Sequence, residues 1–177
     1  MKFKYSLVKD DLLQYQLFSF SQRKSTKNRQ LLLTVIFPTV YLLIGVYLYV
    51  RTRDIFTGVF FIVIGVLWYF FYPKYANWRY KRHFQAHVNR LFAGKEKLHL
   101  EVNFQGAEMH LEDEDSNSTI KKSAFTELVQ TPEHFFLIQE SGYAIVFPKR
   151  ENIRLAELET AYQGIPINFV DAQDWQW

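Results

Sequence analysis

The feature that most constrains this chain is a pair of long uncharged segments with almost nothing between them. Residues 31–50 and 55–72 contain no charged side chain, and only the tetrapeptide RTRD separates them. Twenty helical residues rise about 30 Å, which matches the hydrocarbon core of a bilayer. A linker of four residues allows only a tight reversal. The sequence therefore predicts a transmembrane helical hairpin over residues 31–73, with its two spans antiparallel.

Two other interpretations of an apolar run are less favourable here. A buried core helix would explain one such run, but two adjacent runs without charge are typical of membrane spans. A cleaved signal peptide is also disfavoured, because the first run begins after thirty residues of patterned sequence and no small-residue cleavage site follows it. Pro38 is compatible with a spanning helix, since neighbouring groups can satisfy the carbonyl that it frees.

The orientation of the hairpin follows from the basic residues at its ends. Eight lysines and arginines flank the outer ends of the spans, against two in the connecting loop, Arg51 and Arg53. The positive-inside rule then predicts that both termini lie in the cytoplasm. The eight flanking residues are Arg23, Lys24, Lys27, Arg29, Lys74, Arg79, Lys81 and Arg82.

Aromatic residues gather where the second apolar segment becomes basic. Tyrosine and tryptophan favour the headgroup level of a membrane, and the adjacent cations would meet anionic lipid there. We interpret these cations as determinants of topology in preference to a specific lipid pocket. The predicted membrane-interface residues are Trp68, Tyr72, Lys74, Tyr75, Trp78, Arg79, Lys81 and Arg82.

The segments outside the hairpin differ in pattern and in charge. Residues 1–30 read as a short strand followed by a helix that Asp10 would cap, and residues 74–94 read as a basic aromatic helix that ends at Gly94. Residues 1–94 carry 14 lysines and arginines against 3 acidic residues, whereas residues 95–177 carry 7 against 15. This asymmetry predicts different surroundings for the two halves, and the acidic second half argues against nucleic-acid binding.

A period of two residues appears in the second half. Six short β-rich segments are separated by turn residues, and a helix near residues 153–162, capped by Asn152, follows them. Residues 95–177 are therefore expected to form a cytosolic antiparallel sheet with a C-terminal helix, an α+β outline that a pleckstrin-homology-like domain shares with other small folds. The N-terminal strand could extend an edge of that sheet. The six segments are 98–103, 107–112, 118–122, 125–131, 134–140 and 143–149.

The order of these elements resembles the YcxB-like family of bacterial membrane proteins over essentially the whole chain. The most specific part of the resemblance is FTELVQTPEHFFLIQESGYAIVFPKR, residues 125–150. The similarity implies a protein of the bacterial inner (cytoplasmic) membrane with both termini in the cytoplasm. It carries no catalytic residues over to this chain, so it implies topology and fold only.

Motifs for catalysis or metal binding are weak. The seven glycines form no phosphate loop, and the absence of cysteine excludes thiolate chemistry. His83 and His87 are spaced for one helix face but lack a third ligand, and the acidic run 112–115 lacks the ligand spacing of a calcium loop. We therefore expect no metal, no cofactor and no enzymatic activity.

Lys149 and Arg150 form the most interesting polar pair, because they follow an apolar strand directly. They could contact a phosphate or a partner's carboxylate. The alternative, which we favour, is that they form surface ion pairs with Glu151 or Glu157.

Three functions remain open at this point. The leading hypothesis is a membrane-anchored cytosolic interaction or regulatory module, which binds the lipid bilayer and either a protein partner or a second copy. Self-association could use the small residues Gly45, Gly58 and Gly65. The alternatives are a protein that senses lipid headgroups and an enzyme of unrecognised type with His83 or His110 as a base.

Overall fold

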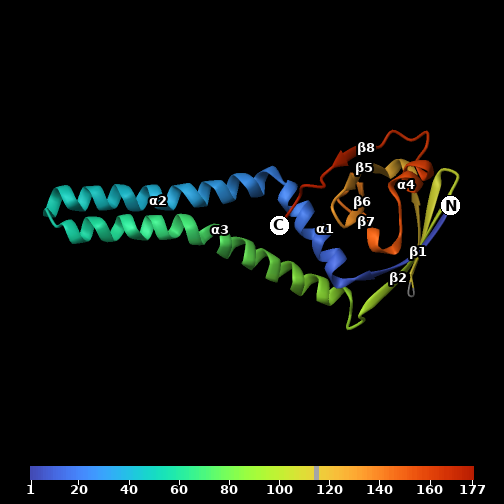
Figure 1. The fold of residues 1–177 in the computed structure, drawn as a ribbon, viewed down its shortest axis with the longest axis horizontal. Helices are drawn as coiled ribbons and strands as arrows, with labels where there is room; N and C mark the ends of the chain where they lie inside the picture. Colours follow the sequence, from blue (N-terminus) through green and yellow to red (C-terminus); the bar gives the residue numbers. More distant parts are fainter. Residues whose placement is uncertain (114–115) are drawn as a thin grey trace. The chain divides into compact units, whose positions relative to one another are not determined.

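The computed structural model describes residues 1–113 and 116–177, without the side chains of Lys24 and Lys27. The chain is an α+β protein with two long apolar helices and two four-stranded sheets (Figure 1). It divides into two compact units. The hairpin unit comprises Leu17–Gln85, and the sheet unit comprises Met1–Gln16 together with Ala86–Trp177.

The two apolar segments form the predicted helical hairpin. Helix α2 (Lys24–Thr52) and helix α3 (Ile55–Leu91) are joined by only two residues, Arg53 and Asp54. Arg53 takes a left-handed conformation with φ of 55°. Asp54 then caps α3, because its carboxylate accepts hydrogen bonds from the Phe56 amide at 3.0 Å and from the Thr57 hydroxyl. The reversal is as tight as the sequence predicts.

Helix α3 continues well past the apolar segment. Pro73 lies inside it, and the basic aromatic segment expected as a helix over 74–94 is its final part, which ends at Leu91. Gly94 follows the end of the helix with φ of 88°, a conformation that glycine adopts without steric cost.

Small residues bring α2 and α3 close together. A Cβ atom on Gly45 would lie 3.1 Å from the Cβ of Phe61 and 3.2 Å from the carbonyl oxygen of Gly58. A Cβ atom on Gly65 would meet the backbone of Pro38 at 3.4 Å. The glycines considered for self-association therefore lie buried within the hairpin, where they serve contact between its own two helices.

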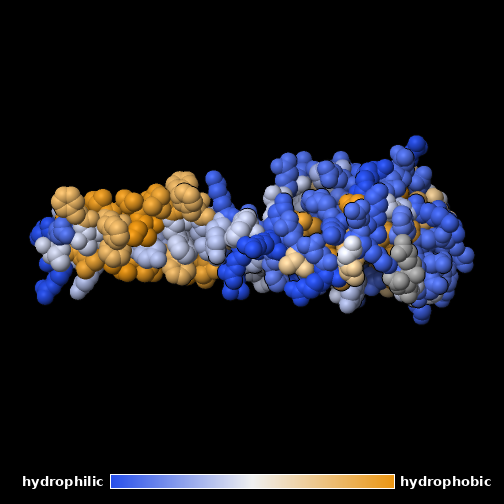
Figure 2. Space-filling model, turned by 90° about the horizontal axis from the view of Figure 1, so that it is seen from below, coloured by the Kyte–Doolittle hydropathy of each residue, from blue (hydrophilic) through white to orange (hydrophobic). Residues whose placement is uncertain are grey.

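The outer faces of the hairpin are apolar and uncovered. Segments Asn28–Thr52 and Ile55–Leu91 are long and apolar enough to cross a membrane, and only 6% and 11% of their most apolar windows are buried. Figure 2 shows hydrophobic residues gathered along these helices, with hydrophilic residues at the loop end. A core helix of a soluble domain would be mostly buried, so neither α2 nor α3 fits the alternative of a buried core helix.

The first sheet, sheet A, contains strands from both ends of the sequence. Its order is β1 (Lys2–Val8), β2 (Lys97–Gln105), β3 (Glu108–Asp113) and β4 (Asn117–Lys121), all antiparallel. Strand β1 pairs with β2 from Lys2↔Asn103 to Val8↔Lys97. The prediction that the N-terminal strand extends a sheet edge is confirmed. The whole helical hairpin is thus inserted between two neighbouring strands.

The second sheet, sheet B, has the order β7-β6-β5-β8. It consists of β5 (Phe125–Gln130), β6 (His134–Gln139), β7 (Ala144–Pro148) and β8 (Asn168–Asp171). The six predicted strands are present, but they do not form one continuous meander, because the short 3₁₀ helix η1 (Lys122–Ala124) separates β4 from β5. Strand β8 was not predicted, and it pairs with β5 in parallel.

Sheet B is covered on both faces around β6. Phe147, on one face, packs against Phe3 and Tyr5 of β1 at ring-centroid distances of 5.9 and 5.3 Å. Phe136, on the other face, contacts Tyr15 of helix α1 (Lys9–Gln22) at 5.4 Å. This double coverage explains why the sequence HFFL in β6 does not alternate between apolar and polar residues.

The two turns predicted around β6 are both present, one of them with a different loop length. The Pro132–Glu133 turn is confirmed by the hydrogen bond from the Thr131 amide to the His134 carbonyl at 2.9 Å. The β6–β7 loop has three residues between Gln139 and Tyr143, in place of the two predicted, because Gly142 with φ of 85° adds a bulge.

The predicted helix caps are both wrong. At α1 the capping carboxylate belongs to Asp11, which accepts the Val8 amide at 2.7 Å, and not to Asp10. Asn152 ends the 3₁₀ helix η2 (Lys149–Glu151) with φ of 59°. Arg154 occupies the position before helix α4 (Leu155–Ala161).

Candidate functional site

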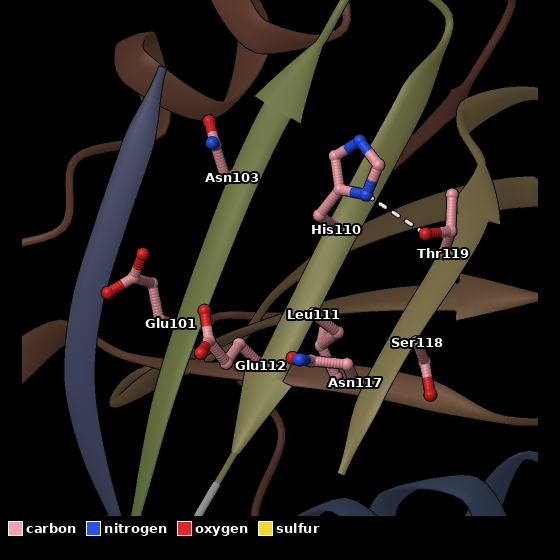
Figure 3. A pocket seen from close by; sticks show the side chains of 8 residues that line it. All are labelled: Glu101, Asn103, His110, Leu111, Glu112, Asn117, Ser118 and Thr119. Carbon is pink, nitrogen blue, oxygen red and sulfur yellow. Dashed lines mark hydrogen bonds between the residues drawn. The ribbon is translucent and has the colours of Figure 1, made fainter.

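The outer face of sheet A carries a polar site. Its cavity of about 300 Å³ is lined by residues of three neighbouring strands. Figure 3 shows these side chains, and the register places Asn103, His110 and Thr119 in one cross-strand row. The lining residues are Glu101, Asn103, His110, Leu111, Glu112, Asn117, Ser118 and Thr119.

Charges on this face are partly neutralised within the sheet. Glu101 forms ion pairs with Lys2 and, at 2.8 Å, with Lys4 on the neighbouring strand, and these hydrogen bonds hold the pKa of the Glu101 carboxyl below its usual value. The Nδ1 atom of His110 lies 2.9 Å from the Thr119 hydroxyl. The face therefore presents amides, hydroxyls and paired charges, which suit hydrogen-bonded recognition.

The described residues of this face do not form a metal site. Among the described residues, no group of three or more histidine, aspartate or glutamate side chains could hold a metal ion. His83 and His87 lie exposed on α3, where no third ligand joins them within the described part of the chain. Of the acidic run 112–115, residues 114 and 115 lie outside the described residues, and the Asp113 carboxylate accepts the Ser116 amide at 2.7 Å.

A second polar cluster in the sheet unit, the Asp11 cluster (Asp11, His134 and Arg150), combines two buried side chains, Asp11 and His134, with the partly exposed Arg150. The Nε2–H of His134 donates to Asp11 Oδ1 at 2.9 Å, and Arg150 donates to both carboxylate oxygens, with its Nη2 at 2.7 Å from Oδ2. Arg150 Nη2 also donates to the carbonyl oxygen of Ser6 at 3.0 Å. The cluster therefore joins the first turn of α1 to the end of β1, to β6 and to the segment after β7.

The Asp11 carboxylate is held in its ionised form. Burial alone would raise the pKa of the Asp11 carboxyl, but the hydrogen bonds from Arg150, His134 and the Val8 amide outweigh this effect and lower the pKa to about 2. Asp11 and His134 are only 2% and 3% exposed. An aspartate–histidine pair can orient a general base, but here both side chains are almost fully buried, and the His134 Nε2 atom is engaged by the Asp11 carboxylate. We therefore interpret the Asp11 cluster as a structural contact between α1, β1 and sheet B.

Arg150 and Lys149 have separate environments. Arg150 is paired with Asp11, and its only other carboxylate within 4.0 Å among the described residues is that of Glu151. The Lys149 ammonium lies 4.9 Å from the ring centroid of Phe135, and partial burial lowers its pKa. Of the two pairings expected as alternatives, the one with Glu151 is observed for Arg150, whereas the Glu157 carboxylate accepts the Arg154 amide. Contact of Lys149 and Arg150 with a ligand stays a prediction.

The predicted interface residues on α3 divide into two sets. Trp68 points toward α2, and its Nε1 atom lies 3.4 Å from the Leu33 carbonyl oxygen. Its ring also stacks on that of Tyr72, one turn along α3, with centroids 5.2 Å apart. Tyr75 and Trp78 are more than half exposed. The basic residues Lys74, Arg79, Lys81 and Arg82 are also exposed.

The sequence interpretation missed the Asp11 cluster. Asp11 lies between Leu7 and Tyr15 in the sequence, both of which are buried apolar residues. An acidic residue among core positions is a signal for a buried partner, because an unpaired buried carboxylate is costly. The identity of the partners could not be read from sequence, since 139 positions separate Asp11 from Arg150.

Comparisons with protein-family models, with curated proteins and with solved structures each found no match to this chain.

Proposed function

We propose that the chain is a membrane-anchored interaction or regulatory module, with its sheet unit in the cytoplasm. The observation that carries this proposal is the insertion of an uncovered apolar hairpin between two paired strands, β1 and β2. Because Val8 and Lys97 pair directly, the chain leaves sheet A and returns to it at one point. A hairpin that crosses the bilayer twice satisfies this constraint.

The proposed fold of the sheet unit is pleckstrin-homology-like. Four antiparallel strands, then three more, and then helix α4 after β7 support this assignment. The added strand β8 and the seven-residue length of α4 are departures from the simple outline. We also propose membership of the YcxB-like family, on the pattern of residues 125–150, and with it a bacterial inner membrane location with both termini in the cytoplasm.

Binding is favoured over catalysis by the chemistry of the two polar sites. The exposed face of sheet A offers hydrogen-bonding side chains, whereas the ionised Asp11 and its histidine are sealed in the interior. A recognition surface carried by a rigid sheet and held near the membrane is suited to an adaptor or a regulator.

The test is purification of the tagged full-length protein from its native membrane in mild detergent, with mass spectrometry of the proteins that accompany it. The variant N103A/H110A/T119A removes one polar row from the outer face of sheet A. The control T126A/E140A/S141A changes three exposed residues elsewhere in the sheet unit. We expect a stoichiometric protein that the first variant loses and the control keeps. Purification of the parent without any stoichiometric protein would contradict the proposal.

A further inference from the structure

One stripe of α3 joins an exposed apolar surface to an exposed cationic one. Phe71, Tyr75, Trp78, Arg82 and Gln85 follow one another at intervals of three or four residues, which places them on one helix face. The exposed fractions of the three aromatic side chains are 64%, 54% and 56%. The rings of Tyr75 and Trp78 are in contact, with centroids 6.1 Å apart.

The cationic end of this stripe surrounds a hollow. A cavity of about 480 Å³ is lined by Trp78, Lys81, Arg82 and Gln85, and the Arg82 guanidinium lies 5.5 Å from the centroid of the Trp78 ring. Helical side chains lean toward the N-terminus of their helix. Arg82 accordingly reaches back over Trp78, toward the apolar part of α3.

Lys81 and Arg82 form no ion pair with another described residue. Helix α3 contains no aspartate or glutamate over Ile55–Leu91. The hollow therefore combines an amphipathic tryptophan ring, two unpaired cations and an amide.

We propose that this hollow binds the phosphate of an anionic phospholipid, with the acyl chains along the exposed apolar part of the stripe at Phe71 and Tyr75. The proposal rests on the membrane-spanning hairpin proposed above. Lysine and arginine donate charge-assisted hydrogen bonds to phosphate oxygens, and tryptophan favours the headgroup level.

The position of the hollow along the helix suits a lipid better than a soluble phosphate. Trp78 lies about 9 Å beyond Tyr72 along a helix axis, which places its ring at the outer edge of a headgroup layer roughly 5–8 Å thick, and the long side chains of Lys81 and Arg82 lean back toward that layer. The apolar side chains that continue the stripe would be adjacent to the hydrocarbon. A soluble phosphate would contact only the cationic end of the stripe.

The test is native mass spectrometry of the full-length protein in detergent, titrated with phosphatidylglycerol, with phosphatidylcholine or with inorganic phosphate. The variant K81Q/R82Q removes the two cations of the hollow. The control R23Q/R29Q removes the same charge from exposed positions at the start of α2, on the same predicted side of the membrane. The variant K81R/R82K keeps the charge and checks that the site tolerates substitution.

We expect the parent to prefer phosphatidylglycerol over phosphatidylcholine and to show no measurable binding of inorganic phosphate. Since each cation near an anionic lipid surface contributes about fivefold, K81Q/R82Q should bind phosphatidylglycerol about thirtyfold more weakly. The control and the charge-preserving variant should bind like the parent. The proposal would be overturned if K81Q/R82Q and R23Q/R29Q lost affinity for phosphatidylglycerol equally, or if neither lost any. It would also be overturned if the parent bound inorganic phosphate as tightly as phosphatidylglycerol.

A separate measurement distinguishes this failure from a failure of the membrane proposal. Alkaline carbonate releases peripheral proteins from membranes but leaves integral proteins behind. If K81Q/R82Q and the parent both stay in the membrane while the lipid preference is absent, only the phospholipid site is refuted. Release of the parent by carbonate would refute both.

Discussion

Replacement of Asp11 by asparagine should weaken the sheet unit far more than the same change at the neighbouring Asp10. The Asp11 carboxylate accepts hydrogen bonds from the Val8 amide at 2.7 Å, from His134 at 2.9 Å and from Arg150. An asparagine side chain has nearly the same shape, but it offers one acceptor oxygen and brings an NH₂ group toward donors. At least one buried donor is then left unsatisfied.

The magnitude follows from two estimates. The pKa of Asp11 falls from 3.8 to about 2, and that difference corresponds to about 2 kcal/mol of stabilisation from ionisation. Removal of one partner from a buried pair costs about 3–5 kcal/mol. The side chain of Arg150 is 44% exposed, so water compensates for part of its loss. We therefore expect D11N to lower the free energy of unfolding by about 3 kcal/mol.

The assay is urea-dependent protease susceptibility of the full-length protein in mild detergent, which reports the free energy of unfolding. The matched control is D10N. Asp10 is exposed, and its contact among the described residues is with Gln14 at 3.4 Å, so its replacement should cost less than about 0.5 kcal/mol. Equal stability of D11N and D10N would refute the structural role of the Asp11 cluster.

Three further predictions concern other parts of the chain. The folded-state pKa of Asp11 is depressed to about 2, so the stability that its ionised carboxylate contributes should be complete above about pH 4 and should be lost as the pH falls toward 2. The free energy of unfolding of D11N should not show this loss over the same pH window. G45L should lower the melting temperature of the full-length protein in detergent. A Cβ atom at position 45 would already lie 3.1 Å from the Cβ of Phe61, and overpacking of this kind costs about 1–3 kcal/mol. V46L, on the exposed face of the same helix, should melt at the same temperature as the parent. K122A should lower the free energy of unfolding in the protease assay by about 2 kcal/mol, because the buried Lys122 ammonium donates a hydrogen bond to the Ala161 carbonyl oxygen at 2.8 Å and its aliphatic part is buried. K121A, at the exposed neighbouring position, should have little effect.

Local patterns predicted most of the elements. The two uncharged segments predicted α2 and α3, and the period of two residues predicted β2 to β7, because hydrophobic periodicity reflects the surroundings of each element. Turn chemistry predicted the Pro132–Glu133 reversal. The N-terminal strand could be placed at a sheet edge because the predicted topology keeps both ends of the chain on one side of the membrane.

Long-range pairing could not be predicted in the same way. Strand β8 has only four residues, is mostly exposed and pairs in parallel with β5, so it has no alternating pattern of its own. The Asp11 cluster depends on side chains that are distant in the sequence. Asp11 was also overlooked because Asp10, beside it, is an equally good capping residue by type. Tertiary context decided between the two.

The same limit applied to the glycines of the hairpin. Gly45, Gly58 and Gly65 predicted close helix contact, but the sequence could not distinguish contact within one hairpin from contact between two copies. The short linker at Arg53 and Asp54 brings α2 and α3 together, so the contact lies within the hairpin.

Site-specific labelling tests the central claim most directly, because the chain contains no native cysteine. T52C places a thiol at the tip of the hairpin, and S118C places one on the exposed strand β4. In intact bacterial spheroplasts, a membrane-impermeant maleimide should label T52C at once and S118C only after lysis. Labelling of S118C in intact spheroplasts, or protection of both thiols until lysis, would contradict a hairpin that crosses the membrane with its sheet unit in the cytoplasm.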